Sequence, residues 1–150
     1  DPDSVELNKP AATQLVRDLA AYGKISRMDD CTRSRKYLND TAIRMTNTVP
    51  TEDTLLGDET TYYKEALRQQ GVAEATFEDF RKRLEDTQLR DYQRTGPYSL
   101  FVVDGYMGHS WGYLHAAGSP LQPQQQLQVG RHRVWVLEPL GDEWYRVGGH

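Results

Sequence analysis

The most unusual residues of this chain lie between positions 104 and 113, where the sequence reads DGYMGHSWGY. Asp104 and His109 can form an acid–base pair, because imidazole titrates near neutral pH and a carboxylate can exchange or orient its proton. The aromatic rings nearby offer large contact areas with polar edges. The segment therefore predicts either a catalytic pair or a contact surface, and the residues predicted to bind are Tyr106, His109, Trp111 and Tyr113.

The same segment holds three glycines, at positions 105, 108 and 112. Gly105 follows Asp104 in a dipeptide typical of a tight turn. Gly112 lies inside an alternating stretch, where glycine weakens a strand and marks a close approach of another group. The spacing predicts a hairpin turn at 104–105 and, at Gly112, contact with an internal aromatic ring or a bound group. A structural interpretation, in which the aromatic residues cover the helices, is favoured over the functional one.

Other kinds of site are disfavoured by the residues present. The sequence has neither GxxxxGK[ST] nor GxGxxG, so a backbone cradle for phosphates is not expected. His109, His115 and His132 occur without an HExxH or HxH pattern, and Cys31 is a single thiol that can form neither an internal disulfide nor a cysteine-rich zinc site. The sequence predicts no metal site and no cofactor.

The composition limits the possible partners. The net charge is −4 and the isoelectric point is about 5.5, which argues against a protein that neutralises many nucleic-acid phosphates. Mean hydropathy is −0.76, and no apolar run approaches the roughly 20 residues of a membrane-spanning helix. The chain begins with Asp1 instead of Met, which favours a processed bacterial protein that is exported or periplasmic.

The first part of the chain shows mainly helical spacing of its apolar residues. Asn8 can cap a helix that Gly23 ends, with Leu15, Val16 and Leu19 on its buried face. Further helices are predicted over residues 29–47, 58–71 and 76–89.

From Gly96 onward the apolar period shortens from about 3.6 to 2. Strands are predicted over residues 98–103, 110–116, 131–138 and 143–147, with a polar loop over 118–130. Short links between consecutive strands require antiparallel pairing. The predicted fold class is therefore α+β, with about four N-terminal helices followed by a four-stranded antiparallel β-meander. We expect a single domain over residues 1–150, mainly helical in 1–95 and an antiparallel sheet in 96–150.

The core is predicted to form where this sheet meets the helices. Phe101 or Leu100, together with Trp135 or Trp144, should be buried against Leu67, Phe77 and Phe80. Trp144 and Tyr145 are adjacent in a strand, so their side chains must point to opposite faces of the sheet.

These observations favour a small soluble accessory or binding domain that acts by contact with another protein or a small ligand. One alternative is a pocket enzyme, acid–base or hydrolytic, that uses Asp104 and His109. Another is a subunit of a larger assembly. Side chains that converge in a concave site would favour the enzyme, whereas side chains dispersed over a flat surface would favour binding.

Overall fold

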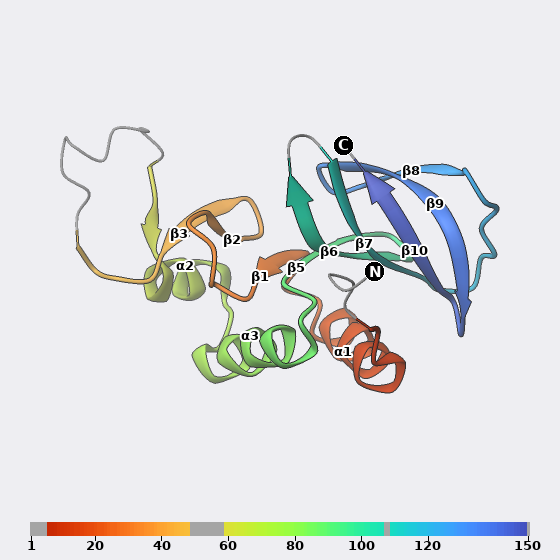
Figure 1. The fold of residues 1–150 in the computed structure, drawn as a ribbon. Helices are drawn as coiled ribbons and strands as arrows, with labels where there is room; N and C mark the ends of the chain where they lie inside the picture. Colours follow the sequence, from red (N-terminus) through yellow and green to blue (C-terminus); the bar gives the residue numbers. More distant parts are fainter. Residues whose placement is uncertain (1–5, 49–58, 107–108, 150) are drawn as a thin grey trace.

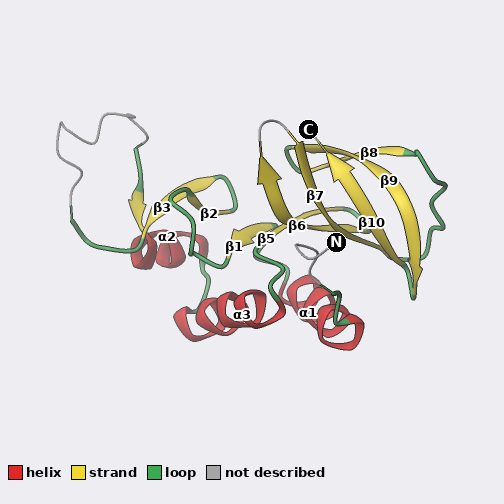
Figure 2. Ribbon diagram, viewed as in Figure 1, coloured by secondary structure: helices red, strands yellow, loops and turns green. Residues whose placement is uncertain are grey.

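The computed structural model describes residues 6–48, 59–106 and 109–149, with Tyr106 and His109 described by their backbones alone (Figures 1 and 2). Within these ranges the chain forms three helices, which are α1 (Lys9–Tyr22), α2 (Tyr63–Gln70) and α3 (Glu74–Thr87). It also forms ten strands, which are β1 (Arg27–Asp29), β2 (Lys36–Leu38), β3 (Thr41–Arg44), β4 (Thr61–Tyr62), β5 (Asp91–Thr95), β6 (Tyr98–Tyr106), β7 (His109–Ala116), β8 (Gln126–Val129), β9 (His132–Gly141) and β10 (Trp144–Gly149).

All ten strands belong to one sheet, in the order β4-β3-β2-β1-β5-β6-β7-β10-β9-β8. Every pairing is antiparallel except that of β3 with β4. The fold is therefore α+β with an antiparallel-dominated sheet, but the prediction of four helices before a four-stranded meander is wrong. Five of the strands precede position 96, so the boundary at 95/96 does not separate helices from sheet.

The C-terminal part of the sheet curls back on itself, as the right side of Figure 1 shows. The strand at the end of the sheet order, β8, lies close to β5, although four other strands separate the two in that order. Side chains of β5 bind the residues that follow β8. The Thr95 hydroxyl accepts a hydrogen bond from the Gly130 N–H at 2.8 Å, and the Gln93 amide oxygen accepts one from the Arg131 N–H at 2.9 Å.

The predicted helix that Asn8 caps and Gly23 ends is confirmed as α1. Asn8 caps α1 by accepting a hydrogen bond from the Ala11 N–H, and Gly23 ends it in the left-handed region at φ 77°. The helix predicted over residues 58–71 is confirmed only in its later part, because Thr61 and Tyr62 form β4 and α2 begins at Tyr63. Gly71 ends α2 in the same way at φ 68°, and the Val72 N–H then donates to the Leu67 carbonyl. No helix in the described ranges has the length and apolar character needed to cross a lipid bilayer.

The helix predicted over residues 29–47 is wrong, because this segment forms β2 and β3 after the end of β1. A two-residue turn joins β2 to β3, with Asn39 in the left-handed region at φ 54°. The Asn39 side chain accepts a hydrogen bond from the Ser26 N–H and donates to the Lys24 carbonyl. These bonds tie the hairpin to the segment between α1 and β1, which a continuous helix over 29–47 would not allow.

The strands predicted in the C-terminal part are confirmed as β6, β7, β9 and β10. Two details of the prediction are wrong. Asp104 and Gly105 do not form the turn, because they pair with Trp111 and Ser110 inside the β6–β7 ladder. The predicted loop over 118–130 contains β8, in which Leu127 alternates with glutamines.

Each face of the sheet has its own apolar core. The helices cover one face, with α1 and α3 side by side beneath it (Figure 2), and bury Phe101 and Trp144 with Leu67, Phe77 and Phe80 as predicted. The concave face of the curled part holds the second core, which consists of Leu100, Val102, Leu114, Ala116, Leu121, Val129, Val134, Val136, Tyr145 and Val147. Trp144 and Tyr145 belong to different cores, as their adjacency requires.

Candidate functional site

A β-bulge in β6 directs residues of the predicted hairpin toward the helices. Val102 pairs with Gly112 and Asp104 pairs with Trp111, so Val103 is an extra residue in β6. Val102 packs in the concave core. Val103 packs in the core between the sheet and the helices, and Trp111 packs against that core. The extra residue reverses the alternation beyond it, which brings Asp104 to the face that Trp111 occupies.

Gly112 is the residue that makes this bulge possible. A Cβ atom at position 112 would lie 2.0 Å from the carbonyl oxygen of Phe101 and 3.1 Å from the Cα atom of Val102. The close approach predicted at Gly112 is therefore internal. Its partner is the backbone of the neighbouring strand, however, and not an aromatic ring.

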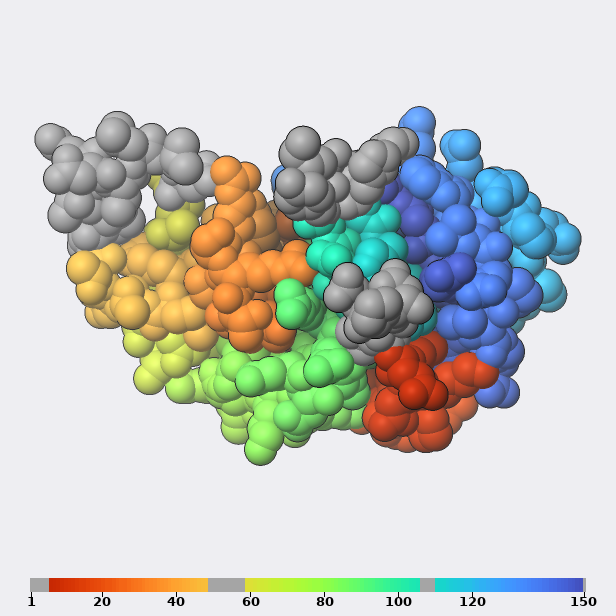
Figure 3. All heavy atoms as spheres, in the orientation of Figure 1, coloured from red at the N-terminus to blue at the C-terminus, as the bar shows by residue number. Residues whose placement is uncertain are grey.

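Asp104 and Trp111 form one wall of a cleft of about 550 Å³. The other walls come from the segment after β1, the last turn of α3 and the connection from α3 to β5. Figure 3 shows these segments, coloured orange, green and cyan, meeting on one face of the molecule. The residues that line the cleft are Asp30, Thr32, Glu85, Gln88, Arg90, Val103, Asp104 and Trp111.

Asp30 is the most deeply buried charged residue of the lining, with 4% of its surface exposed. Its Oδ1 atom accepts hydrogen bonds from the Thr32 N–H at 3.1 Å and the Thr32 hydroxyl at 2.7 Å. Its backbone N–H donates to the Arg90 carbonyl at 2.8 Å. These three bonds fix Asp30 in the cleft wall.

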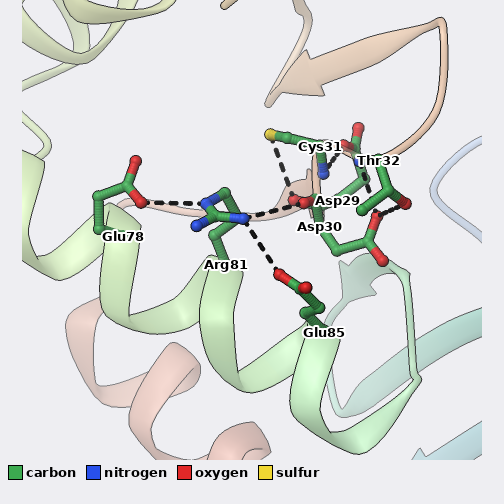
Figure 4. Close-up of polar contacts among 7 residues, drawn as sticks. All are labelled: Asp29, Asp30, Cys31, Thr32, Glu78, Arg81 and Glu85. Carbon is green, nitrogen blue, oxygen red and sulfur yellow. Dashed lines mark hydrogen bonds and ion pairs between the residues drawn. The ribbon is translucent and has the colours of Figure 1, made fainter.

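Arg81 of α3 connects the walls of the cleft, as Figure 4 shows. Its guanidinium forms ion pairs with Glu78 at 3.0 Å and Glu85 at 3.3 Å, and donates to the Asp30 carbonyl oxygen at 3.4 Å. Only about a quarter of the Arg81 side chain is exposed, at 26%. The arginine therefore holds α3 against the loop that carries Asp30.

Three of the seven non-glycine residues with positive φ in the described ranges lie beside the cleft. Cys31, Gln88 and Arg90 all have positive φ values, of 62°, 58° and 47°. For residues other than glycine, this left-handed region costs of the order of 1 kcal/mol each. Two of the three line the cleft and the third lies between Asp30 and Thr32, so the surrounding contacts hold the walls in conformations that the chain would not adopt alone.

Two further carboxylates lie next to this loop. Asp29 and Asp91 are direct partners in the β1–β5 ladder, so their side chains lie on the same face. Asp29 accepts hydrogen bonds from the Cys31 N–H at 2.7 Å and the Tyr37 N–H at 3.0 Å. Burial and the nearby Asp29 carboxylate raise the pKa of Asp91 to about 7, and burial also raises the pKa of Asp29.

We expect Asp91 to make the protein less stable as the pH rises toward neutrality. The folded protein holds the Asp91 proton up to about pH 7, whereas the unfolded chain loses it near pH 3.8. The proton therefore favours the folded state, and the free energy of unfolding should fall between about pH 4 and pH 7. Asp91→Asn stays uncharged and should flatten this fall.

Urea unfolding of both proteins at several pH values measures the difference. Burial lowers the pKa values of His115 and His132, but both histidines are present in both proteins, so their contribution cancels. Parallel curves of unfolding free energy against pH for the two proteins would show that Asp91 is not responsible.

Cys31 is not placed as a nucleophile. The predicted helix beside it is absent, and burial together with the Asp29 carboxylate raises the pKa of the thiol to about 12. Its Sγ–H donates weakly to the Asp29 carbonyl oxygen at 3.7 Å. A thiol with this pKa carries almost no thiolate at neutral pH, which is the reactive form.

The structure brings together only part of the predicted site. Asp104 and Trp111 share the cleft. Tyr113 is 6% exposed and packs against Trp111, with the two rings edge to face at a centroid distance of 5.8 Å. The side chains of Tyr106 and His109 lie outside the described part, and their backbones pair with each other in the ladder.

Most of the cleft lining was not predicted from the sequence. Asp30, Thr32, Glu85, Gln88 and Arg90 come from segments that only the tertiary fold brings together. The Asp30-Cys31-Thr32 run carries a local signal, because an aspartate accepting from the residue two positions on is a typical turn. That signal predicts a turn but no site.

Across the described ranges, no group of three or more His, Cys, Asp or Glu residues is arranged to hold a metal ion. Comparison of the chain with protein-family models, with curated proteins and with solved structures finds no match.

Proposed function

We propose that this chain is a binding domain that holds a ligand, or a segment of another protein, in the cleft between Asp30 and Trp111. One observation carries the proposal: the bulge at Val103 brings Asp104 to the same face as Trp111, where both line a cleft of about 550 Å³. This volume lies within the range of ordinary ligand sites, which combine an aromatic surface with a few polar groups.

The stiffness of the walls supports a binding role. Arg81 and Thr32 hold the loop around Asp30, so a ligand would meet a surface that is already formed. A preformed site binds more tightly, because less conformational entropy is lost when the ligand arrives. By contrast, the concave interior of the curled sheet is filled by the ten buried side chains of the second core.

The proposal can be tested with 5-fluorotryptophan, which places a fluorine reporter at each of the three tryptophans. Only Trp111 lines the cleft; Trp144 is fully buried. Soluble compounds of several classes (amino acids, short peptides, sugars, nucleotides) are added in turn while the ¹⁹F spectrum is recorded. We expect at least one class to shift the Trp111 signal alone, in a saturable way.

Matched variants make the assignment secure. Trp111→Phe identifies the Trp111 signal by its loss, and Trp135→Phe does the same for a tryptophan outside the cleft. Thermal unfolding of Trp111→Phe should remain close to that of the parent, because the ring is only half-buried. If no class shifts the signal, or all three tryptophan signals move together, the cleft is not a binding site.

A further inference from the structure

We infer that the carboxyl groups of Asp29 and Asp91 form a pH-dependent switch, which keeps two walls of the cleft together while the pair holds a proton and lets them separate once both groups are charged. The change of structure belongs to the chain alone. Its effect on a ligand rests on the proposed function, because the walls matter only to a molecule that occupies the cleft.

The pair lies at the point where the two walls diverge. Asp29 is the last residue of β1 and Asp91 is the first residue of β5, and the two are direct partners in the antiparallel ladder. On the other side of Asp91, β6 places the uncharged Val102 opposite it. The residues just after Asp29, drawn in Figure 4, form one wall of the cleft, and the residues just before Asp91 form another. A force that separates the two carboxyl groups therefore acts on both walls.

One backbone hydrogen bond joins the walls next to the pair. The Asp30 N–H donates to the Arg90 carbonyl oxygen at 2.8 Å. Cys31 and Arg90 beside it have positive φ values of 62° and 47°, which are unfavourable for residues other than glycine. Loss of this bond would let both residues return to ordinary backbone conformations, so the closed arrangement depends on its contacts.

Within the pair, the proton is expected on Asp91. Both oxygens of Asp29 accept backbone N–H groups, Oδ1 from Cys31 at 2.7 Å and Oδ2 from Tyr37 at 3.0 Å, and such donors favour the charged form of a carboxyl group. Because Asp29 is only 6% exposed, water screens its charge weakly. Burial and this charge raise the pKa of Asp91 to about 7, and two carboxylates that face each other across a ladder repel.

The other charged groups around the pair moderate this repulsion without removing it. Arg27 of β1 and Arg33 of the following loop lower the pKa of Asp91, whereas the Asp30 carboxylate raises it. The Cys31 thiol stays neutral at these pH values, because burial raises its pKa to about 12. The balance still leaves the pKa of Asp91 raised, so the two arginines do not compensate for burial and the neighbouring carboxylates.

The direction of the pH effect follows from the two states of the walls. When the walls are apart, Asp91 is hydrated and distant from Asp29, so its pKa should approach the ordinary value of 3.8. When they are together, Asp91 keeps its proton up to about pH 7. The proton therefore favours the closed walls, and the equilibrium should shift toward separation by at most about tenfold per pH unit between about pH 4 and pH 7. Above about pH 7 both states are charged, so the shift should level off.

Amide hydrogen exchange of the complete ¹⁵N-labelled chain tests the switch. The probe is the Asp30 N–H, whose bond to Arg90 spans the two walls. Its protection, corrected for the intrinsic pH dependence of exchange, should fall by up to about tenfold per unit between about pH 5 and pH 7 and then level off.

A low concentration of urea separates local opening from global unfolding. Local opening exposes little surface, so exchange of the Asp30 N–H should hardly respond to urea. Leu114 lies in β7 between β6 and β10 and is fully buried, so its N–H reports global unfolding and should exchange faster in urea.

Asp91→Asn removes the titrating proton and keeps a side chain of the same shape. Protection of the Asp30 N–H should then no longer change with pH. Asp40→Asn is the matched control, because Asp40 is exposed in the turn between β2 and β3 and its replacement should leave the fall in protection unchanged.

Two variants of Arg33 test the charge balance without altering the pair. Arg33→Gln removes a positive charge that lowers the pKa of Asp91, so protection should level off at a higher pH than in the parent. Arg33→Lys keeps the charge and should level off where the parent does. The same levelling pH for Arg33→Gln and the parent would contradict titration of Asp91 as the cause.

The possible failures can be distinguished. Protection of the Asp30 N–H that is constant with pH, or that falls equally in Asp91→Asn, would overturn the switch. Exchange at Asp30 that responds to urea as strongly as exchange at Leu114 would also overturn it, because the walls would then separate only when the whole chain unfolds.

The proposed function has its own outcome. An uncharged compound that shifts the Trp111 signal should bind more tightly at about pH 5.5 than at about pH 8, and equal affinity would show that the walls do not control the cleft. A pH-dependent opening at Asp30, with no compound that shifts the Trp111 signal, would leave the switch intact and overturn the binding proposal.

Discussion

Replacing Trp144 with alanine is expected to lower the free energy of unfolding by about 5 kcal/mol. Trp144 is the largest fully buried side chain, and its ring packs against Phe101 at a centroid distance of 6.0 Å and His115 at 5.0 Å. Its indole N–H also donates to the Thr13 hydroxyl at 2.9 Å, which links β10 to α1. The substitution therefore leaves a large cavity and a hydroxyl without its donor.

Chemical denaturation measures this loss, and two variants separate its causes. Trp144→Phe keeps most of the apolar area and should cost much less than the alanine variant. Thr13→Ala removes the hydrogen bond alone and should cost about 1 kcal/mol. A loss below about 1 kcal/mol for Trp144→Ala would show that the sheet and α1 are not joined through this residue.

Replacing Gly112 with alanine is expected to cost more than about 3 kcal/mol, although only one methyl group is added. The new Cβ atom would lie 2.0 Å from the Phe101 carbonyl oxygen, which belongs to the backbone of β6 and cannot rotate away. The two strands must separate at the bulge. We therefore also expect the variant to displace Asp104 and Trp111 and to lose ligand binding even where it remains folded.

Gly148→Ala is the control for this prediction. Its Cβ atom would meet the indole of Trp135 at 3.1 Å, and a side chain can shift where a backbone cannot. The loss of stability should be clearly smaller than for Gly112→Ala. Equal losses for the two variants would mean that the tight contact at the bulge has no special role.

The elements predicted correctly are those whose signals are local. The N-terminal helix has a side-chain cap at Asn8 and a left-handed glycine at position 23, and both act within one turn. In β9, the buried Val134 and Val136 alternate with more exposed residues, so period 2 was visible in the sequence. In β6, residues Leu100 to Val103 are buried on both faces and form a short apolar run, which is also typical of a strand. In each case, nearby residues specify the structure without help from distant ones.

The segment 29–47 was mispredicted because its apolar residues suit either structure. Tyr37, Leu38, Ala42 and Met45 fall on one helical face, but their spacing also fits two short strands. The deciding feature is Asn39, whose side chain bonds to the segment before β1 and to Gln70 of α2. Those bonds exist only in the folded chain, so local periodicity could not resolve the ambiguity.

Only the hairpin wall of the candidate site could be predicted, because the other wall also depends on contacts between residues that are distant in the sequence. The composition of residues 104–113 indicated where to look, and Gly112 indicated that a close approach occurs there. The orientation of Asp104 depends on the extra residue Val103, and bulges leave no composition signal of their own. The opposite wall includes Asp30 and Arg90, which lie 74 and 14 positions before Asp104 in the sequence.

The presence of a core on each face of the sheet has a consequence for how accurately the strands must pair. In β6, Leu100 packs in one core and Phe101 in the other. A slip of β6 by one residue would exchange the two side chains, so it would disrupt both cores at once. A mispaired form therefore loses stability in both cores, so the middle of the sheet should select the native register during folding. The bulge at Val103 lies beyond these residues, toward the end of the hairpin.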